Sequence, residues 1–440
     1  MRPQLTTTFL FSLAASALAN HDQLVKRQSQ ASSAPAASGT VVVGVTIPPL
    51  AQITMGMPTQ QVPVATRTAP PGATPPIAGA PTLPSPAWSF VQGQWPAMDK
   101  PIDTSTDQVK EWMKELDGYN IPDLKPTVDG SCANDTAAAA NASARGWWTC
   151  GGYTRATDIT ACPTKLQWGV SFDDGPSPYT TNLLTYLHDK NISATFFVVG
   201  SRVISYPDIL INEYMAGHEI AVHTWSHPHL TALTNEQIVA ELGWTRHAIK
   251  SVLGVTPTTM RPPYGDIDDR VRMISLAMGL VPIIWTRTPS GASFDTFDWR
   301  VAGGVVDGTT SFNTFQNILS NATTLDTGFC VLQHDLYEIT VDLALGYTMN
   351  AALSHNPAFN LESIGRCNKI PATNMFVESN VNKSFPFPSP PASMAGQGGN
   401  SSTNGKVSSR GGAGGSSDAQ SLRWSALLAA GALASTLLFA

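Results

Sequence analysis

The sequence Leu166-Gln-Trp-Gly-Val-Ser-Phe-Asp-Asp-Gly-Pro176 places an acidic pair, Asp173 and Asp174, directly after a short apolar run. Further short apolar runs follow along the chain, at 194–199, 219–222, 258–260, 281–285 and 328–332. Runs of this length, separated by longer helical patterns, are typical of buried strands in an α/β domain. The alternation across 165–366 therefore predicts a parallel α/β sheet or barrel.

One connecting segment carries clear helix signals. Thr234 and Gln237 have the spacing of a capping box, and Gly254 is suited to end a helix. The residues between them that share one helical face are Ile238, Leu242, Thr245 and Ile249. A shorter helix is predicted earlier in the chain from the spacing of Val109, Trp112, Met113 and Leu116. The adjacent Trp147 and Trp148 are compatible with either a core position or a binding platform.

Polar residues gather where the predicted strands end. They are Asp173 and Asp174, His223, Arg261, the 287–299 loop and His334. Parallel α/β barrels build their active sites at the carboxyl ends of the strands. The sequence thus predicts that these five segments converge on one site.

Three of these residues suit a metal ion. His223 and His227 are four residues apart, which lets two imidazoles face one cation, and Gly175-Pro176 turns the chain so that the preceding carboxylates reach the same cavity. Taken singly, a histidine pair on a surface helix or an acidic turn is the commoner case. Together they offer two imidazoles and a carboxylate with an open fourth position, which is typical of catalytic zinc.

The same residues carry a resemblance to a known family. The motifs SFDDGP (171–176), HTWSH (223–227), RPPYG (261–265), DTFDW (295–299) and LQH (332–334) resemble, in order and spacing, those of the NodB-homology polysaccharide deacetylases, carbohydrate esterase family 4. Ser171 departs from the threonine that many members have. The resemblance covers 165–366 and implies a distorted (β/α) barrel.

The resemblance also implies a role for each motif residue. Asp174, His223 and His227 would bind Zn²⁺, with Co²⁺ as an alternative, and Asp173 would be the general base. Arg261 would pair with that base, the backbone N–H of Tyr264 would stabilise the oxyanion, and His334 would protonate the leaving amine. Asp298 would orient His334. The acetyl methyl pocket would be lined by Trp299 and Leu332.

The expected substrate is chitin or a chitooligosaccharide, whose N-acetyl groups would be hydrolysed to give chitosan and acetate. Acetylated xylan and peptidoglycan remain alternatives, because esters and amides share a tetrahedral intermediate. A non-catalytic glycan-binding wall protein is a third alternative, which predicts loss of a base or ligand that this chain retains. A net charge of -6 without a basic block argues against nucleic-acid binding.

The segments outside 165–366 indicate export. Residues 1–19 have the pattern of a signal peptide, 20–87 that of a Ser/Thr/Pro-rich stalk or propeptide, and 88–164 that of an extension packed on the catalytic domain. Residues 367–415 read as a flexible tail and 416–440 as a GPI-attachment signal, with Gly415 as the attachment residue. We therefore expect a secreted protein that is located in the cell wall and at the outer face of the cell membrane. A retained hydrophobic anchor and wall glucan attachment stay open.

Five cysteines and six glycosylation sequons fit that route. Cys132 with Cys150 would close a local loop, and Cys162 with Cys367 would join the two ends of the domain, although spacing alone does not fix connectivity. Cys330 lies in an apolar run and is expected to be a buried thiol. The sequons are Asn134, Asn141, Asn191, Asn321, Asn382 and Asn400.

Overall fold

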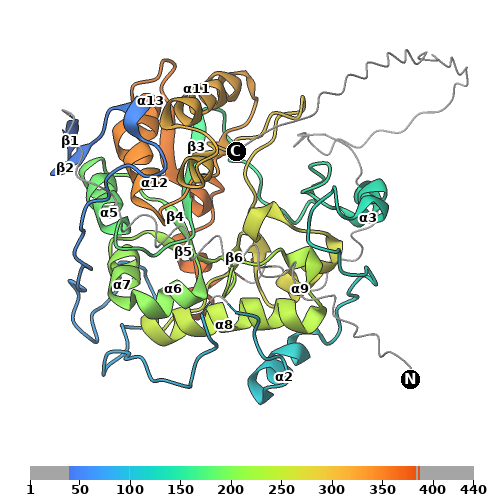
Figure 1. Cartoon of the computed structure of the whole chain (residues 1–440). Coiled ribbons are helices and arrows are strands. Elements are labelled where there is room, and N and C mark those ends of the chain that lie inside the picture. Colours follow the sequence, from blue (N-terminus) through green and yellow to red (C-terminus); the bar gives the residue numbers. More distant parts are fainter. Residues whose placement is uncertain (1–38, 99, 383–384, 387–440) are drawn as a thin grey trace, which may run out of the picture. The chain divides into compact units, whose positions relative to one another are not determined.

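The computed structural model describes residues 39–98, 100–382 and 385–386 (Figure 1). Its central sheet has the strand order β7-β6-β5-β4-β3-β8, with β9 paired to β3, and every pairing is parallel. The strands are β3 (Gln167–Asp173), β4 (Thr195–Val198), β5 (Glu219–Val222), β6 (Thr259–Met260), β7 (Val281–Pro282), β8 (Phe329–Cys330) and β9 (Asn360–Ser363).

Helices lie around the outside of these strands, and α8 passes beneath them in Figure 1. They are α5 (Thr180–Asp189), α6 (Gly200–Ser205), α7 (Pro207–Met215), α8 (Asn235–Leu253), α9 (Asp269–Ala277), α10 (Asp298–Ala302), α11 (Gly308–Thr324), α12 (Glu338–Leu343), α13 (Met349–Leu353) and α14 (Ile364–Cys367). Short helical turns occur at η3 (Leu230–Ala232), η4 (Pro263–Gly265) and η5 (Ala344–Thr348).

The two outer strands of the sheet approach each other through irregular chain. Beyond β7, Thr286 N–H donates to Cys330 O at 3.0 Å, and Leu332 N–H donates to Phe294 O at 2.9 Å. These bonds link β7 to β8 without a regular ladder, because the intervening 287–299 segment loops out. The result is a distorted (β/α) barrel, as the family resemblance implied.

Side chains alternate between the two faces of the strands. In β3, Trp168, Val170 and Phe172 are fully buried against the surrounding helices and belong to the main core cluster. A separate buried cluster of inward-facing side chains contains Phe197, Ala221, Ile283, Cys330 and Ile364. Because these strands run parallel, Asp173 at the end of β3 and His223 directly after β5 lie at the same, carboxyl end of the barrel.

The sequence located six strands and the main helix within two residues, except that the run 281–285 extends three residues past the end of β7. Thr234 caps α8 by a capping box with Gln237, and Gly254 ends it at a φ of 82°. Strand β9 was not predicted, because its sequence Asn-Leu-Glu-Ser lacks an apolar run and it pairs along β3 only in the folded chain.

The prediction of a flexible stalk over 20–87 is wrong for residues 39–87. This segment forms β1 (Thr40–Val42), β2 (Val45–Ile47) and η1 (Leu50–Gln52), and it buries Ile47, Ile53 and Leu83 in the main core cluster. Its apolar residues pack against the barrel from an extended segment and not from one face of a helix, so they show no helical periodicity. Frequent prolines restrict the unfolded chain, which lowers the entropy lost on ordering.

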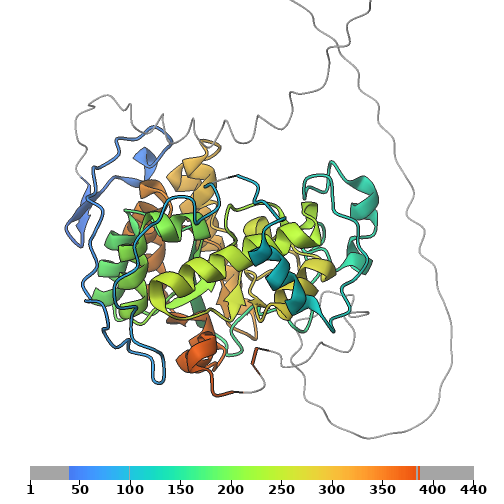
Figure 2. The ribbon, with the colours of Figure 1, turned by 90° about the horizontal axis from the view of Figure 1, so that it is seen from below.

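The extension from 88 to 164 packs on the helices α8 and α9. It contains α2 (Asp107–Met113), η2 (Lys114–Leu116), α3 (Thr136–Ala140) and α4 (Ala142–Arg145). Figure 2 shows α2 lying against α8. Trp147 and Trp148 are buried, and Trp147 Nε1 donates to Asp266 at 2.8 Å, so their role is packing rather than an exposed platform.

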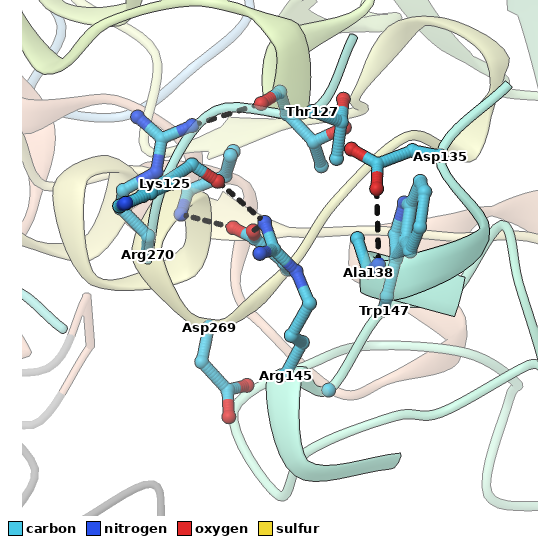
Figure 3. A network of polar contacts seen from close by, with 12 residues as sticks. Lys125, Thr127, Asp135, Ala138, Arg145, Trp147, Asp269 and Arg270 are labelled. Carbon is cyan, nitrogen blue, oxygen red and sulfur yellow. Dashed lines mark hydrogen bonds and ion pairs between the residues drawn. The ribbon is translucent and has the colours of Figure 1, made fainter. Parts of the chain in front are cut away.

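Buried ion pairs attach the extension to the N-terminal end of α9. Arg145 contacts Asp268 at 2.7 Å and also donates to the carbonyl of Lys125, beside Asp269 and Arg270 (Figure 3). Two more pairs join the same surfaces, Arg155 with Asp269 at 2.8 Å and Arg272 with Asp158 at 2.9 Å. Such pairs stabilise the docked arrangement, because loss of one partner leaves a buried charge uncompensated.

The domain continues beyond the predicted boundary at 366. Residues 372–379 form η6 (Ala372–Met375) and η7 (Val377–Ser379), and Met375 and Phe376 are buried. Thr258 N–H donates to Met375 O at 3.0 Å, which ties this segment to the chain before β6. The start of the predicted flexible tail at 367 is therefore wrong. The apolar pair Met375 and Phe376 is short and lies near Pro- and Ser-rich sequence, so its burial was not predicted.

Both predicted disulfides are formed. Cys132 bonds to Cys150, Cys162 bonds to Cys367, and Cys330 is a buried free thiol. No helix among the described residues is both long and apolar enough to span a membrane.

The remaining predictions concern the glycosylation sites and the two ends of the chain. The side chains of Asn134, Asn141, Asn191 and Asn382 are exposed, and that of Asn321 is partly exposed. The predicted signal peptide at 1–19, the sequon at Asn400, the attachment residue Gly415 and the 416–440 signal lie outside the described residues.

Candidate active site

Asp174, His223 and His227 meet at the carboxyl end of the barrel. Asp174 Oδ1 lies 3.4 Å from His223 Nε2 and 3.2 Å from His227 Nε2, and one potential ligand atom from each residue lies within 4.8 Å of the others. Asp174 Oδ1 is buried and makes no hydrogen bond of good geometry within the described residues. A buried carboxylate oxygen facing two imidazoles fits a cation between them.

Protonation also favours a metal site. His223 Nδ1 lies 2.8 Å from the carbonyl oxygen of Arg261, so Nδ1–H donates there and the Nε2 lone pair faces Asp174. Burial lowers the pKa of His227 to about 3, which leaves a neutral imidazole. Burial acts to raise the pKa of Asp174, but the nearby imidazoles bring it well below its usual value. A neutral His227 imidazole and an ionised Asp174 carboxylate are the forms that bind a divalent cation.

The backbone around these residues is unusual. Asp174, Thr224, His227, Tyr264 and Phe297 are not glycines, yet all have φ between 58° and 77°. Non-glycine residues in this left-handed region are uncommon and are concentrated at functional sites. Here it occurs at two of the three candidate metal ligands, Asp174 and His227, and at Tyr264, whose ring packs on His227.

Asp173 and Arg261 form a buried ion pair beside the triad. Arg261 Nη1 donates to Asp173 Oδ1 at 2.7 Å, and both side chains are at most 1% exposed. The guanidinium carbon of Arg261 lies 4.1 Å from the ring centroid of Phe197, and this cation–π contact helps to hold the guanidinium in place. Asp173 Oδ2 lies 3.9 Å from His223 Nε2. The second carboxylate of the acidic pair is therefore placed next to the triad and oriented by a cation.

His334 and Asp298 form a second pair at the same mouth. His334 Nδ1 lies 2.7 Å from Asp298 Oδ1, and the backbone N–H of His334 donates to Asp298 Oδ2 at 2.8 Å. Burial acts to lower the pKa of His334, but the Asp298 carboxylate outweighs it and raises this pKa to about 10. Asp174 and Asp173 add smaller contributions. His334 is thus a protonated imidazole at neutral pH, suited to donate a proton.

The three predicted substrate contacts lie around these pairs. Tyr264 is 51% exposed and its ring centroid lies 4.6 Å from that of His227. Trp299 is 45% exposed, and its Nε1 donates to Asp295 at 3.3 Å. Leu332 is 7% exposed. Two exposed aromatic rings at a polar mouth are suited to contact a sugar polymer.

Two supporting residues escaped the sequence analysis. Glu241 of α8 accepts hydrogen bonds from Trp225 N, Ser226 N and Ser226 Oγ at 2.7–2.9 Å, and so holds the loop between the two histidines. Asp335 accepts a hydrogen bond from Thr180 and ties the end of β8 to the start of α5. Burial raises the pKa of both carboxyls to about 7. Asp335 had a weak signal in its position after His334, and Glu241 had one in being a charged residue on the apolar face that Ile238 and Leu242 define.

A parallel (β/α) barrel with a candidate metal triad at the carboxyl ends of its strands defines the class of fold and site. Residues 160–283 match the family model described as polysaccharide deacetylase. The chain is 49% identical over 351 residues to chitin deacetylase 1 of Cryptococcus neoformans var. grubii, covering 79% of this chain and 73% of that protein. The chain belongs to the polysaccharide deacetylase family, as its motifs predicted.

Two further comparisons give more distant similarity. The chain is 37% identical over 276 residues to chitin deacetylase 2 of the same Cryptococcus, covering 60% of this chain and 56% of that protein. Among solved structures, the chitin deacetylase of Colletotrichum lindemuthianum is similar with a TM-score of 0.45 and 24% identity, covering 51% of this chain and 97% of that chain.

Proposed function

We propose that this protein is a zinc-dependent chitin deacetylase, which hydrolyses the N-acetyl groups of N-acetylglucosamine units and leaves free amines and acetate. The observation that carries the proposal is the adjacency of the Asp174, His223 and His227 triad to the Asp173–Arg261 ion pair. Similarity to relatives named as chitin deacetylases supports the choice of substrate.

Asp174, His223 and His227 would hold the metal in this proposal. When bound, zinc supplies Lewis acidity, which polarises the acetyl carbonyl and lowers the pKa of water toward ~7. Asp173 accepts the proton from the attacking water, and Arg261 orients the Asp173 carboxylate through a contact of 2.7 Å. The backbone N–H of Tyr264 donates to the oxygen on which negative charge develops.

His334 completes the reaction on the leaving-group side. An amide nitrogen is a poor leaving group until it is protonated, so an acid has to be available at the pH of reaction. The pKa of about 10 keeps His334 protonated at neutral pH, and Asp298 fixes which ring nitrogen faces the substrate. Trp299 and Leu332 would enclose the acetyl methyl group.

Two alternatives have different consequences. A glycan-binding wall protein without catalysis needs no base beside the triad, whereas this chain keeps Asp173 and its arginine partner. A deacetylase of acetylated xylan or peptidoglycan would use the same catalytic residues, so only substrate contacts separate it from a chitin deacetylase. Two exposed aromatic rings, Tyr264 and Trp299, are compatible with any of these polymers.

The test is acetate release by the zinc-loaded protein from chitin oligomers of increasing length, with acetylated xylan and peptidoglycan as controls. We expect chitin oligomers to react fastest, and longer ones better than short ones, because remote sugar contacts stabilise the transition state. A control rate more than about tenfold above the chitin rate would overturn the substrate assignment. No acetate from any polymer, with zinc bound, would favour the glycan-binding alternative.

We further propose that the protein is secreted and held at the outer face of the plasma membrane by a GPI anchor. The support is the sequence pattern at 1–19 and 416–440. Treatment of intact cells with a phosphatidylinositol-specific phospholipase should release the protein. Release by detergent alone, with the apolar tail still present by mass spectrometry, would show a retained hydrophobic anchor. Protein that resists both treatments would indicate attachment to wall glucan.

A further inference from the structure

The loop that carries both histidine ligands has a conformation that needs support from other elements. Thr224 and His227 both have left-handed backbone conformations, with φ of 64° and 61°. Glu241 supports the middle of this loop from one side, because its carboxylate accepts hydrogen bonds from Trp225 N at 2.8 Å and Ser226 Oγ at 2.7 Å. The positions of the two imidazoles therefore depend on groups outside the loop.

Trp225 lies at the centre of this loop, two residues from each histidine, and the N-terminal extension contacts its ring. The Trp225 side chain is fully buried. Trp95 stacks on it with ring centroids 6.2 Å apart and an interplanar angle of 3°, and Trp225 Nε1 donates to the carbonyl of Ala97 at 3.2 Å. Both partners lie outside the segment 160–283 that matches the family model.

Trp95 is itself fixed by an aromatic cluster. Its ring lies 5.8 Å from Trp88 and 5.9 Å from Trp244, both edge to face, and 5.2 Å from the His247 ring. Edge-to-face and offset stacked rings at these separations attract one another beyond simple burial. Trp244 and His247 belong to α8, and Trp244 also contacts Trp225 edge to face at 6.3 Å. Trp95 therefore completes an aromatic cluster that joins α8 to the loop.

We propose that Trp95 is a positioning residue for the metal site, acting through Trp225 on His223 and His227. The inference rests on the proposed metal binding. Metal ligands have to be held within about 0.5 Å of their working geometry. Without the Trp95 ring, Trp225 loses its stacking surface and the strained loop can relax toward commoner backbone conformations. The cation would then be bound less tightly, although every ligand is still present.

The test measures zinc affinity of the full chain by competition with a chelating dye, together with the melting temperature of the metal-free protein. Trp95→Ala should weaken zinc binding by about tenfold, since residues behind the ligands typically change metal affinity by roughly 10- to 100-fold. Trp95→Phe, which keeps an aromatic face, should recover most of the affinity. Trp95→Leu serves as the aliphatic variant if the alanine variant does not fold.

Trp112→Ala is the matched control. Trp112 also belongs to the extension and packs on Trp244 at 5.4 Å and on His247 at 6.3 Å, but it makes no ring contact with Trp225. We expect it to lower the melting temperature with zinc affinity within about twofold of wild type. Equal zinc affinity in wild type, Trp95→Ala or Trp95→Leu, and Trp112→Ala would overturn the inference. A wild-type protein that binds no zinc would instead overturn the proposed function.

Discussion

Asp298→Asn tests directly whether the Asp298 carboxylate keeps His334 protonated. In the wild type, Asp298 accepts hydrogen bonds from His334 Nδ1 and Trp299 N through Oδ1 and from His334 N through Oδ2, at 2.7–2.8 Å. Asparagine keeps the shape and one acceptor but removes the charge. Burial, which opposes protonation of His334, is then no longer outweighed by a carboxylate in contact.

The magnitude follows from the pKa of His334. It is about 10 in the folded protein, against about 6.5 for a free imidazole, and an opposite charge in contact changes a pKa by about 1–3 units. A bound cation offsets the smaller contributions of Asp173 and Asp174, so the alkaline limb of kcat/KM should lie no higher than about 10. Asp298→Asn should lower that limb by about two units, which is roughly a 100-fold loss of kcat/KM at pH values above both limbs.

The assay is kcat/KM for acetate release from pH 5 to about 11, so that it extends past both limbs. Asp295→Asn is the control for a neighbouring carboxyl that contacts Trp299 rather than His334. The Asp295 variant should move the alkaline limb much less. An alkaline limb in Asp298→Asn within about half a unit of wild type would refute the assignment of His334 as an acid maintained by Asp298.

The same pair predicts a pH-dependent part of stability. Because the folded pKa of His334 is raised above its unfolded value, its contribution is fully present below pH ~6.5 and is lost as pH rises through about 10. Denaturant unfolding of metal-free wild type should show this decline, and in Asp298→Asn the decline should be smaller and should end at a pH about two units lower. The variant should also be less stable overall by about 1–3 kcal/mol, since one buried backbone donor now faces an amide nitrogen.

The remaining predictions concern the metal and the docked extension. Chelation should abolish acetate release and added zinc or cobalt should restore it, whereas full activity of verified metal-free protein would contradict a metal-dependent mechanism. Asp158→Ala should lower the free energy of unfolding by about 3 kcal/mol, because it leaves the fully buried Arg272 short of a partner. Asp107→Ala, which removes an exposed ion pair with Lys110 in the same extension, should leave the unfolding midpoint unchanged, and equal effects of the two variants would contradict the role given to the buried pair.

The barrel and the polar residues at its mouth were predictable because both depend on local patterns. The apolar runs around Val170 and Phe196 mark buried strands, and the residue after each strand points to a known end of a parallel barrel. The pairings at the mouth, such as Asp173 with Arg261, came from the resemblance between motifs. Periodicity alone does not indicate which carboxylate faces which cation.

The parts that were missed depend on contacts between distant segments. Glu241 lies on the buried face of α8, three residues after Ile238. Only the fold shows that it contacts the loop at Trp225. Leu83 is an isolated apolar residue in a Pro-rich segment, so its burial against the barrel has no sequence signal. Local propensity describes how a segment behaves alone, whereas these residues are ordered by a surface that exists only after the barrel has folded.

The most direct measurement of the central claim is a paired determination of bound zinc and acetate release in Asp173→Asn and His227→Ala. If Asp173 is the base and His227 a ligand, Asp173→Asn should bind nearly one zinc per chain while losing most of its turnover of chitin oligomers, and His227→Ala should lose both. Loss of zinc in Asp173→Asn would mean that the roles of Asp173 and Asp174 are reversed. Undiminished turnover in either variant would contradict the site.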